Sequence, residues 1–308
     1  MIDTGLAALS DSLFWWALAA YGVAMVASFA FLAFKKDRLG SLAVGVTWLG
    51  AAVHLGSVTA RGLAAGRVPW GNMYEYSSLL GLLLVLVYLL WIDRRLGLRE
   101  FAGFALGAAV LSLAFARMVY VPARELVPAL NSIWLKFHVI AAIIGSTLFG
   151  ISFLFTVLTV TKRRWERRTI GSTVGAAHVS TFEPETEIDP ALPPEPRRSG
   201  LMARLPSSLA LDRMSARTVA FAFPIWTFAV LAGAVWAHEA WGRYWGWDPK
   251  ETWAFVTWVI YAAELHARST AGWKGTRVAV INTVGFAAVM FTYFAVNLWI
   301  AGLHSYAK

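Results

Sequence analysis

Eight stretches of mainly apolar sequence limit how this chain of 308 residues can fold more than any other feature does. A helix needs about 20 apolar residues to cross roughly 30 Å of hydrocarbon. The stretches that meet or approach this length are residues 13–34, 42–59, 76–92, 101–119, 134–160, 218–236, 253–267 and 278–300. Charged residues make up only 15% of the chain, whereas soluble domains average about 25%. Because lipid offers no partner for unpaired backbone groups, we predict an all-α, polytopic membrane protein with about eight transmembrane helices and exclude a soluble enzyme.

Lysine and arginine gather in alternate connections between these segments. Of the 27 basic residues, 19 lie in four connections, at residues 35–38, 94–99, 162–217 and 268–277. Connections rich in basic residues stay in the cytoplasm, which predicts that both termini are extracytoplasmic. Membrane orientation also explains the net charge of +9, so we expect no binding of nucleic acid.

One connection is much longer than the others. Residues 162–217 begin with a basic run, and six of the eleven prolines lie between Pro184 and Pro206. Such a composition cannot bury enough apolar surface to fold. We therefore expect a disordered cytoplasmic loop over 162–217, between transmembrane helices 1–5 (residues 1–161) and helices 6–8 (residues 218–308).

The outer connection over residues 236–253 contains five tryptophans. An aromatic belt at the headgroup level is one interpretation, but a belt spreads its rings over all helix ends. Concentration in one loop, with Gly242 and Gly246 between the rings, favours a flat apolar platform for a large planar ligand. Asp248, Pro249 and Glu251 also form the pattern of a capping box, which predicts that a helix begins there.

The histidines suggest what the ligand is. The chain has no cysteine, so any metal must be held by histidine or carboxylate. His138 lies one turn into the fifth segment, and His304 follows the eighth segment on the same predicted face. Two neutral imidazoles beside an aromatic platform fit bis-histidine ligation of a haem, and Arg243 or Lys250 could meet its propionates.

Two more histidines lie inside predicted membrane segments, where ionisable groups are costly and tend to be functional. His54 lies in the second segment and His266 in the seventh. Their predicted depths differ, so a ligand shared by both is not favoured. His266 could receive a ligand that arrives from the cytoplasm.

Several motifs resemble those of a known family. The run WGRYWGWDPKETW at 241–253 resembles the tryptophan-rich WWD signature of haem-handling membrane proteins. The DPKE motif within it, LHAR at 265–268 and GLHSY at 302–306 resemble the CcsA/ResC (CcsB-type) branch of system II cytochrome c biogenesis. NMYE at 72–75 and WLKFH at 134–138 also match. The resemblance covers essentially all of the chain except the long loop.

This resemblance implies a function. Such proteins carry haem to the extracytoplasmic face of the bacterial plasma membrane and present it to apocytochromes c with a Cys-x-x-Cys-His motif. Thioether attachment then occurs in a cytochrome c synthase complex that includes a ResB-type membrane partner. The alternative is a relay, chaperone or exporter of haem in which bond formation is done elsewhere, so the status of the chain as an enzyme stays open. No residue is expected to be catalytic beyond positioning the haem.

The resemblance also assigns residues. His138 and His304 would be axial ligands of the iron of haem b, and His266 would belong to an intramembrane haem site whose second ligand comes from the partner. The WWD segment would hold the haem through Trp241, Trp245, Trp247 and Asp248. Further candidates are Trp236, Arg243, Lys250, Glu251 and His54.

Overall fold

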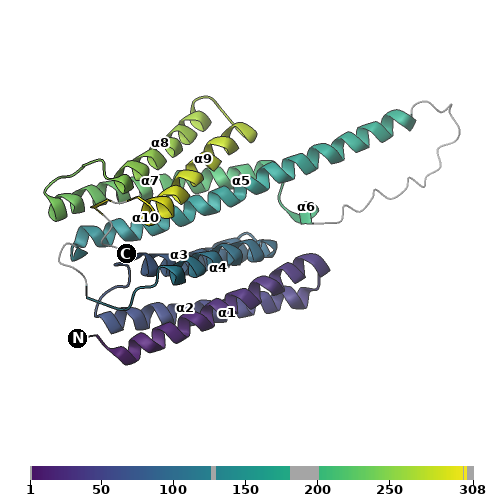
Figure 1. The fold of residues 1–308 in the computed structure, drawn as a ribbon. Coiled ribbons are helices and arrows are strands. Elements are labelled where there is room, and N and C mark those ends of the chain that lie inside the picture. Colours follow the sequence, from purple (N-terminus) through teal and green to yellow (C-terminus); the bar gives the residue numbers. More distant parts are fainter. Residues whose placement is uncertain (1, 126–129, 181–200, 301, 304–308) are drawn as a thin grey trace.

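The computed structural model describes residues 2–125, 130–180, 201–300 and 302–303, and this part of the chain is helical without any strand (Figure 1). The elements are α1 (Thr4–Phe34), α2 (Asp37–Ala65), α3 (Met73–Val87), a π-helical turn η1 (Tyr88–Asp93), a 3₁₀ turn η2 (Arg99–Phe101), α4 (Ala102–Met118), α5 (Ile133–Ser180), α6 (Leu201–Arg204), α7 (Ser208–Trp241), α8 (Pro249–Ser269), α9 (Thr276–Tyr293) and α10 (Ala295–Leu298).

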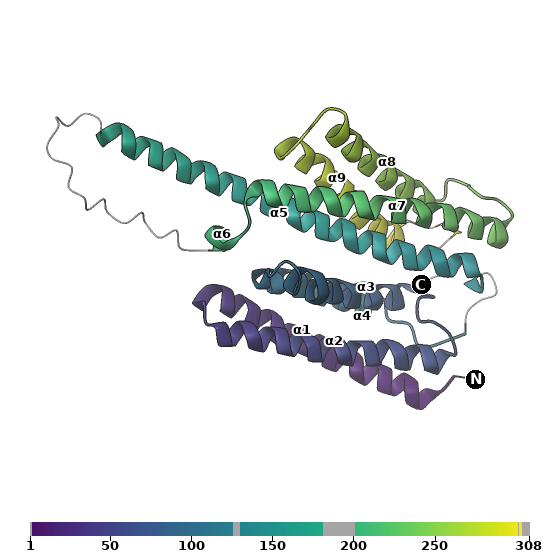
Figure 2. The ribbon, with the colours of Figure 1, turned by 180° about the vertical axis from the view of Figure 1, so that it is seen from behind.

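The long helices pack as antiparallel neighbours in successive layers. α1 packs along α2, and α3 packs along α4. In the third layer α5 packs along α7 and α9, and α8 lies on α9. Figures 1 and 2 show the α3–α4 pair between the α1–α2 hairpin and the layer that contains α5.

Each predicted membrane segment corresponds to a helix or helical stretch, to within two residues at its end. Seven of the described helical stretches are long and apolar enough to cross a membrane. The seventh predicted segment corresponds to α8, which has 21 residues but carries four charged side chains, those of Lys250, Glu251, Glu264 and Arg268. The predicted all-α, polytopic membrane fold is confirmed.

The expectation of one disordered loop over 162–217 is wrong at both of its ends. α5 continues to Ser180, and α7 begins at Ser208, ten residues before the predicted start. The Glu166 carboxylate accepts the backbone N–H of Ser208 at 3.1 Å and its hydroxyl at 2.6 Å. The prediction used the mean composition of 162–217, in which the acidic, proline-rich centre outweighed the helical ends. Residues 181–200 at that centre lie outside the described residues.

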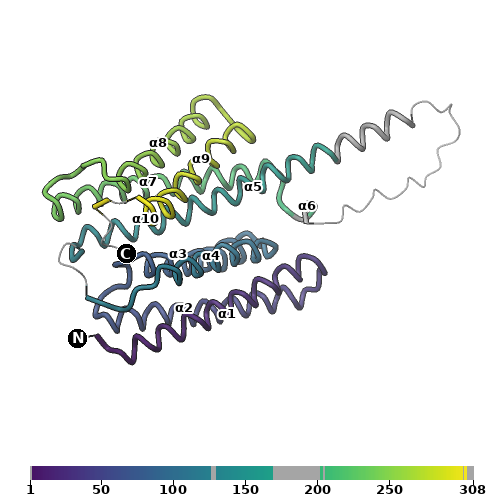
Figure 3. Tube along the Cα trace, in the orientation of Figure 1, coloured from purple at the N-terminus to yellow at the C-terminus, as the bar shows by residue number. Residues whose placement is uncertain are grey.

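The helix ends sort into two groups. The beginning of α1 lies at the same end of the bundle as the α2–α3 and α7–α8 connections (Figure 3). The α1–α2, α3–α4 and α8–α9 connections lie at the opposite end. This grouping is the one that the basic residues predict. We call the first group the outer end, and its extracytoplasmic location stays a prediction.

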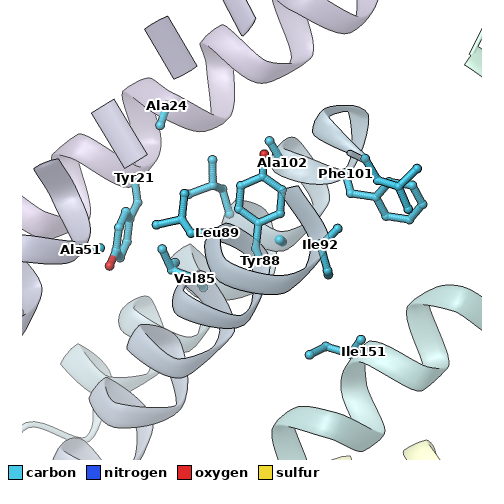
Figure 4. Close-up of a cluster of buried hydrophobic side chains, with 14 of the residues drawn as sticks. Tyr21, Ala24, Ala51, Val85, Tyr88, Leu89, Ile92, Phe101, Ala102 and Ile151 are labelled. Carbon is cyan, nitrogen blue, oxygen red and sulfur yellow. The ribbon is translucent and has the colours of Figure 1, made fainter. Parts of the chain in front are cut away.

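A buried cluster joins the first two layers to α5. Tyr21 from α1, Val85 and Leu89 from α3 and its π-helical turn, and Phe101 are inaccessible or nearly so, and Ile151 of α5 reaches the cluster from the third layer (Figure 4). Gly50 of α2 lies directly against the Tyr21 ring, because a Cβ atom there would be 2.9 Å from ring carbons Cδ1 and Cε1. The α1–α2 spacing thus depends on the missing side chain of Gly50.

We predict that Gly50→Ala lowers the midpoint of thermal unfolding of the detergent-solubilised protein, by a destabilisation of about 1–3 kcal/mol, because the added methyl group overpacks the Tyr21 ring. Gly45→Ala is the matched control, since Gly45 lies in the same helix and a Cβ atom there would meet nothing within 4 Å outside that helix. The control should gain up to about 1 kcal/mol from helix propensity. Equal shifts for both variants would contradict the packing argument.

Candidate functional site

A cavity of about 800 Å³ lies between the α3–α4 pair and the helices α5, α7 and α9. This volume lies in the range of about 300–1,000 Å³ that is typical of ligand pockets. Most of its lining is apolar. At the outer end the lining includes Trp70, Asn72, His138, Trp236, Trp245, Lys250 and Glu251. The cavity therefore brings together residues from four separate parts of the chain.

His138 presents one ring nitrogen to the protein. Its Nδ1 lies 2.8 Å from the carbonyl oxygen of Ala229 in α7. Since a carbonyl only accepts, Nδ1 donates this hydrogen bond, and the neutral ring carries its lone pair on Nε2. A backbone carbonyl that fixes the tautomer in this way is the usual support of a metal-ligating histidine.

The imidazole of His138 also has defined neighbours. It stacks at 20° on the indole of Trp236, with ring centroids 6.4 Å apart. Gly233 of α7 allows close approach, because a Cβ atom there would lie 2.7 Å from Nδ1. His138 is thus positioned by about two turns of α7, from Ala229 to Trp236.

The connection between α7 and α8 is held by the predicted capping box, which is confirmed. Asp248 is the N-cap of α8, with Pro249 at N1. One carboxylate oxygen of Glu251 accepts the backbone N–H groups of Gly246 at 2.9 Å and Asp248 at 3.1 Å. Between them Trp247 has φ of 56°, a conformation that is uncommon for a bulky residue. The box therefore holds a tight turn that exposes the Trp247 ring.

The tryptophans do not form the flat platform expected from their density. The rings of Trp236 and Trp241 meet at 62°, and those of Trp245 and Trp247 meet at 88°. Edge-to-face contact is favoured because the positive ring edge attracts the negative ring face. Trp236 and Trp245 line the cavity, whereas Trp241 packs beside Trp236 and Trp247 is 67% exposed.

The C-terminal segment reaches the same turn. The N–H of Leu303 donates to Asp248 Oδ2 at 2.6 Å, while Oδ1 accepts the N–H of Lys250 at 3.1 Å. Gly302 lies so close that a Cβ atom there would be 2.5 Å from Asp248 Oδ2. His304 lies outside the described residues, but the residue before it is bound to the start of α8.

The other candidates are spread over the molecule. Both ring nitrogens of His54 have protein partners, at 3.2 Å from the Tyr21 hydroxyl and 3.0 Å from the Ser78 hydroxyl, and the residue is fully buried. His266 is exposed on α8, in the third layer, and lies 3.4 Å from Thr270 Oγ1. The structure does not bring these two histidines together. The Arg243 guanidinium lies over Gly246 in its own loop.

A buried ionic cluster that the sequence patterns did not predict lies beside the outer end of the cavity. Glu75 is 1% exposed and receives Arg61 Nε at 3.1 Å and Arg67 at 2.8 and 3.0 Å. The backbone N–H of Gly71 adds a fourth donor at 2.8 Å. Arg61 also donates to the carbonyl of Val121 at 2.5 Å. We call Arg61, Glu75 and Arg67 the outer clamp, because they tie the α2–α3 and α4–α5 connections together.

The outer clamp positions part of the cavity. The segment that it holds carries Trp70, which lines the cavity and packs against the cluster that contains Trp236. Trp236 in turn stacks on His138. In the sequence, Arg61, Arg67 and Glu75 lie close together around a turn. The sequence does not show that their side chains are buried.

A second ionic cluster ties the opposite end of the third layer. Arg268 donates to Glu264 at 3.1 Å and to Asp212 at 3.2 Å. Asn282 donates to Glu264 at 3.0 Å and to Ser152 at 2.9 Å. Four helices therefore meet at the fully buried Glu264, and His266 lies on the other face of α8.

These features define a polytopic helical membrane protein with an apolar ligand cavity that has a tautomer-fixed histidine at its outer end. Residues 70–304 match the family model described as cytochrome C assembly protein. The chain belongs to this family.

Two curated relatives are similar to this chain over most of their length. The chain is 36% identical over 292 residues to the cytochrome c biogenesis protein CcsA of Synechococcus elongatus, covering 87% of each chain. It is 35% identical over 320 residues to CcsA of Gloeobacter violaceus, covering 94% of each. The solved structure of the cytochrome c haem lyase CcmF has the same fold, with a TM-score of 0.68 at 18% identity over 98% of this chain. The chain spans about half of CcmF, 48% of its length.

We predict that Glu75→Gln destabilises the protein by about 3–5 kcal/mol, because it leaves two buried arginines without their carboxylate. Asp11→Asn is the control, since Asp11 pairs with Arg117 at 3.2 Å but both side chains are about one third exposed, and such pairs contribute about 0–1 kcal/mol. Unfolding midpoints in one detergent give the comparison. Faster hydrogen exchange at residues 67–72 in Glu75→Gln would locate the effect, and unchanged exchange there would contradict the clamp.

Proposed function

We propose that this protein binds haem at the outer end of the cavity and presents it for thioether attachment to apocytochromes c. Membership of the cytochrome c assembly family supports a role in cytochrome c maturation. The observation that carries the finer proposal is the position of His138, whose Nδ1 is held by Ala229 so that Nε2 is the nitrogen suited to iron.

The chemistry of the cavity fits a haem. Its walls are mainly apolar and include four indoles, which suits a porphyrin ring, and Lys250 supplies a cation for a propionate. When bound, the haem supplies the vinyl groups that react with thiols. The chain contains no cysteine, so the reacting thiols belong to the Cys-x-x-Cys-His motif of the substrate.

The second axial ligand in this proposal is His304. The proposal is supported by the preceding residue, Leu303, which is hydrogen-bonded to Asp248 at the start of the helix that carries Lys250. The chain would then act as the haem-holding subunit of a holocytochrome c synthase, by positioning the vinyl groups. The outer end would be extracytoplasmic in the bacterial plasma membrane, and a ResB-type protein would be the membrane partner.

His266 has a separate role in the proposal. It is exposed on α8 while Glu264, two residues earlier, is buried among α5, α7 and α9. We expect the second ligand of a haem bound there to come from a partner subunit. We therefore assign His266 to an intramembrane site and exclude His54 from it, because both nitrogens of His54 are engaged.

A relay that delivers haem without catalysing attachment is the second candidate, because most of the described lining of the cavity is apolar and suited to binding. Expression of this chain with a ResB-type partner and a Cys-x-x-Cys-His reporter, in cells without other maturation systems, separates the two. Covalent haem on the reporter supports the synthase. Haem-loaded membranes without covalent product support the relay.

We predict that His138→Ala and His304→Ala each reduce covalent haem on the reporter by at least about a hundredfold, since each removes one axial ligand. Added imidazole should restore part of the activity by filling the vacated coordination position. His238→Ala is the control, because this outer histidine stacks on Tyr244 at 4.3 Å and has no assigned ligand role. Maturation at the normal rate in both ligand variants would disprove the axial assignment.

We predict that Trp245→Ala lowers the haem that co-purifies with the chain by about five- to tenfold, equivalent to the roughly 1–1.5 kcal/mol of one lost aromatic contact. The ratio of Soret absorbance to protein absorbance measures the amount of bound haem. Trp16→Ala is the control, since Trp16 is 70% exposed on α1 and outside the cavity lining. If the two variants retained equal haem, Trp245 would be only an interfacial ring.

A further inference from the structure

The cavity does not end at the His138 site. Along α3 its lining runs from Met73 to Leu84 and on to Ile92, and along α5 it runs from Leu135 to Val157. At 1.5 Å per residue these two stretches are about 28 and 33 Å long, close to the roughly 30 Å of a hydrocarbon core. One continuous cavity therefore extends through most of the depth of the membrane.

The cavity also reaches the lateral surface of the protein. Phe104, Ala108 and Leu111 lie on one face of α4, line the cavity and are exposed, and Leu111 is 72% accessible. On the other side Val157 of α5 lines the cavity and is 43% exposed. Side chains that belong to the lining and to the outer surface mark an opening. We call these four residues the α4–α5 opening.

The opening faces lipid and not water. Its rim is apolar, and it lies in helices that are long and apolar enough to span the membrane. The α3–α4 pair and α5 run side by side in both views of the molecule (Figures 1 and 2). A ligand that passes between them must come from the hydrocarbon.

The polar groups in the deeper lining are already satisfied by the protein. The Ser112 hydroxyl donates to the carbonyl of Ser77 at 2.8 Å, and the Tyr293 hydroxyl donates to Ser77 Oγ at 2.6 Å. Tyr76 and Ser146 pair with each other at 3.2 Å. Because these hydroxyls are engaged, the deeper cavity presents an apolar wall, which suits a ring system dissolved in the membrane and disfavours a polar solute.

We propose that haem reaches the His138 site sideways from the bilayer, through the α4–α5 opening. The inference rests on the proposed function, since it takes haem as the ligand, and adds the route by which haem arrives. The continuity of the opening with the cavity that His138, Trp236 and Lys250 line supports this occupant. The porphyrin ring of haem in the membrane is already desolvated, so the apolar wall presents no further desolvation barrier to the ring.

The test measures uptake of haemin by the full chain in phosphatidylcholine nanodiscs whose bilayer was loaded with haemin beforehand. The growth of the histidine-ligated Soret band gives the rate. Ala108→Trp fills the opening and should slow uptake by at least about tenfold, a barrier of ~1.4 kcal/mol. Ala114→Trp is the matched control, because Ala114 is equally an exposed alanine of α4 but is not in the lining.

A reversible chemical block of the α4–α5 opening distinguishes a closed opening from a misfolded protein. The chain has no cysteine, so Ala108→Cys carries a single thiol that a bulky aromatic thiosulfonate can cap as a disulfide and dithiothreitol can restore. Capping should slow uptake and reduction should return the original rate in the same folded protein. Ala114→Cys, treated identically, should be unaffected.

The outcomes separate the two proposals. A wild-type chain without a His138-dependent Soret band would overturn haem binding itself. A wild-type chain that binds haemin through His138, while the capped Ala108→Cys protein takes it up at the unblocked rate, would overturn only the lateral route. Equal slowing by modification at 108 and 114 would also overturn it.

Discussion

A polar group inside hydrocarbon must find its partner within the protein, and most of this structure follows from that constraint. It makes the long segments helical, and it explains why His54, deep in α2, has a protein partner at each ring nitrogen. It also requires that buried Glu75 be matched by Arg61 and Arg67. At His138 the same requirement places Nδ1 against a helix carbonyl.

The outer site depends on contacts that cross all three layers. The outer clamp holds the segment that carries Trp70, Trp70 packs on the cluster of Trp236, and Trp236 stacks on His138. From the other side, the capping box ties Trp245, Lys250 and the C-terminal segment to the start of α8. These loops are anchored to separate helices, and together they line the outer end of the cavity.

Sequence reasoning succeeded where the signal is local. Length and hydropathy identified eight segments that correspond to described helices, seven of them long and apolar enough to cross a membrane. The Asp248-Pro249-Lys250-Glu251 pattern predicted the start of α8 because a capping box depends on four adjacent residues. It failed where composition was averaged over a long window, as at residues 162–180, which continue α5. It also failed for the tryptophans, because the density of rings in a sequence carries no information about the angles between them.

The amino-acid sequence by itself determined that the chain is a helical membrane protein, which helix ends share a side, and which motifs place it in its family. Those properties follow from residue counts and short spacings. The tertiary structure decided which residues face one cavity, which carbonyl oxygen Nδ1 of His138 contacts, and which side chains of α4 and α5 belong both to the lining and to the outer surface. Those properties depend on pairs such as His138 with Ala229 and Arg61 with Val121, which are far apart in the chain and meet only when the helices pack.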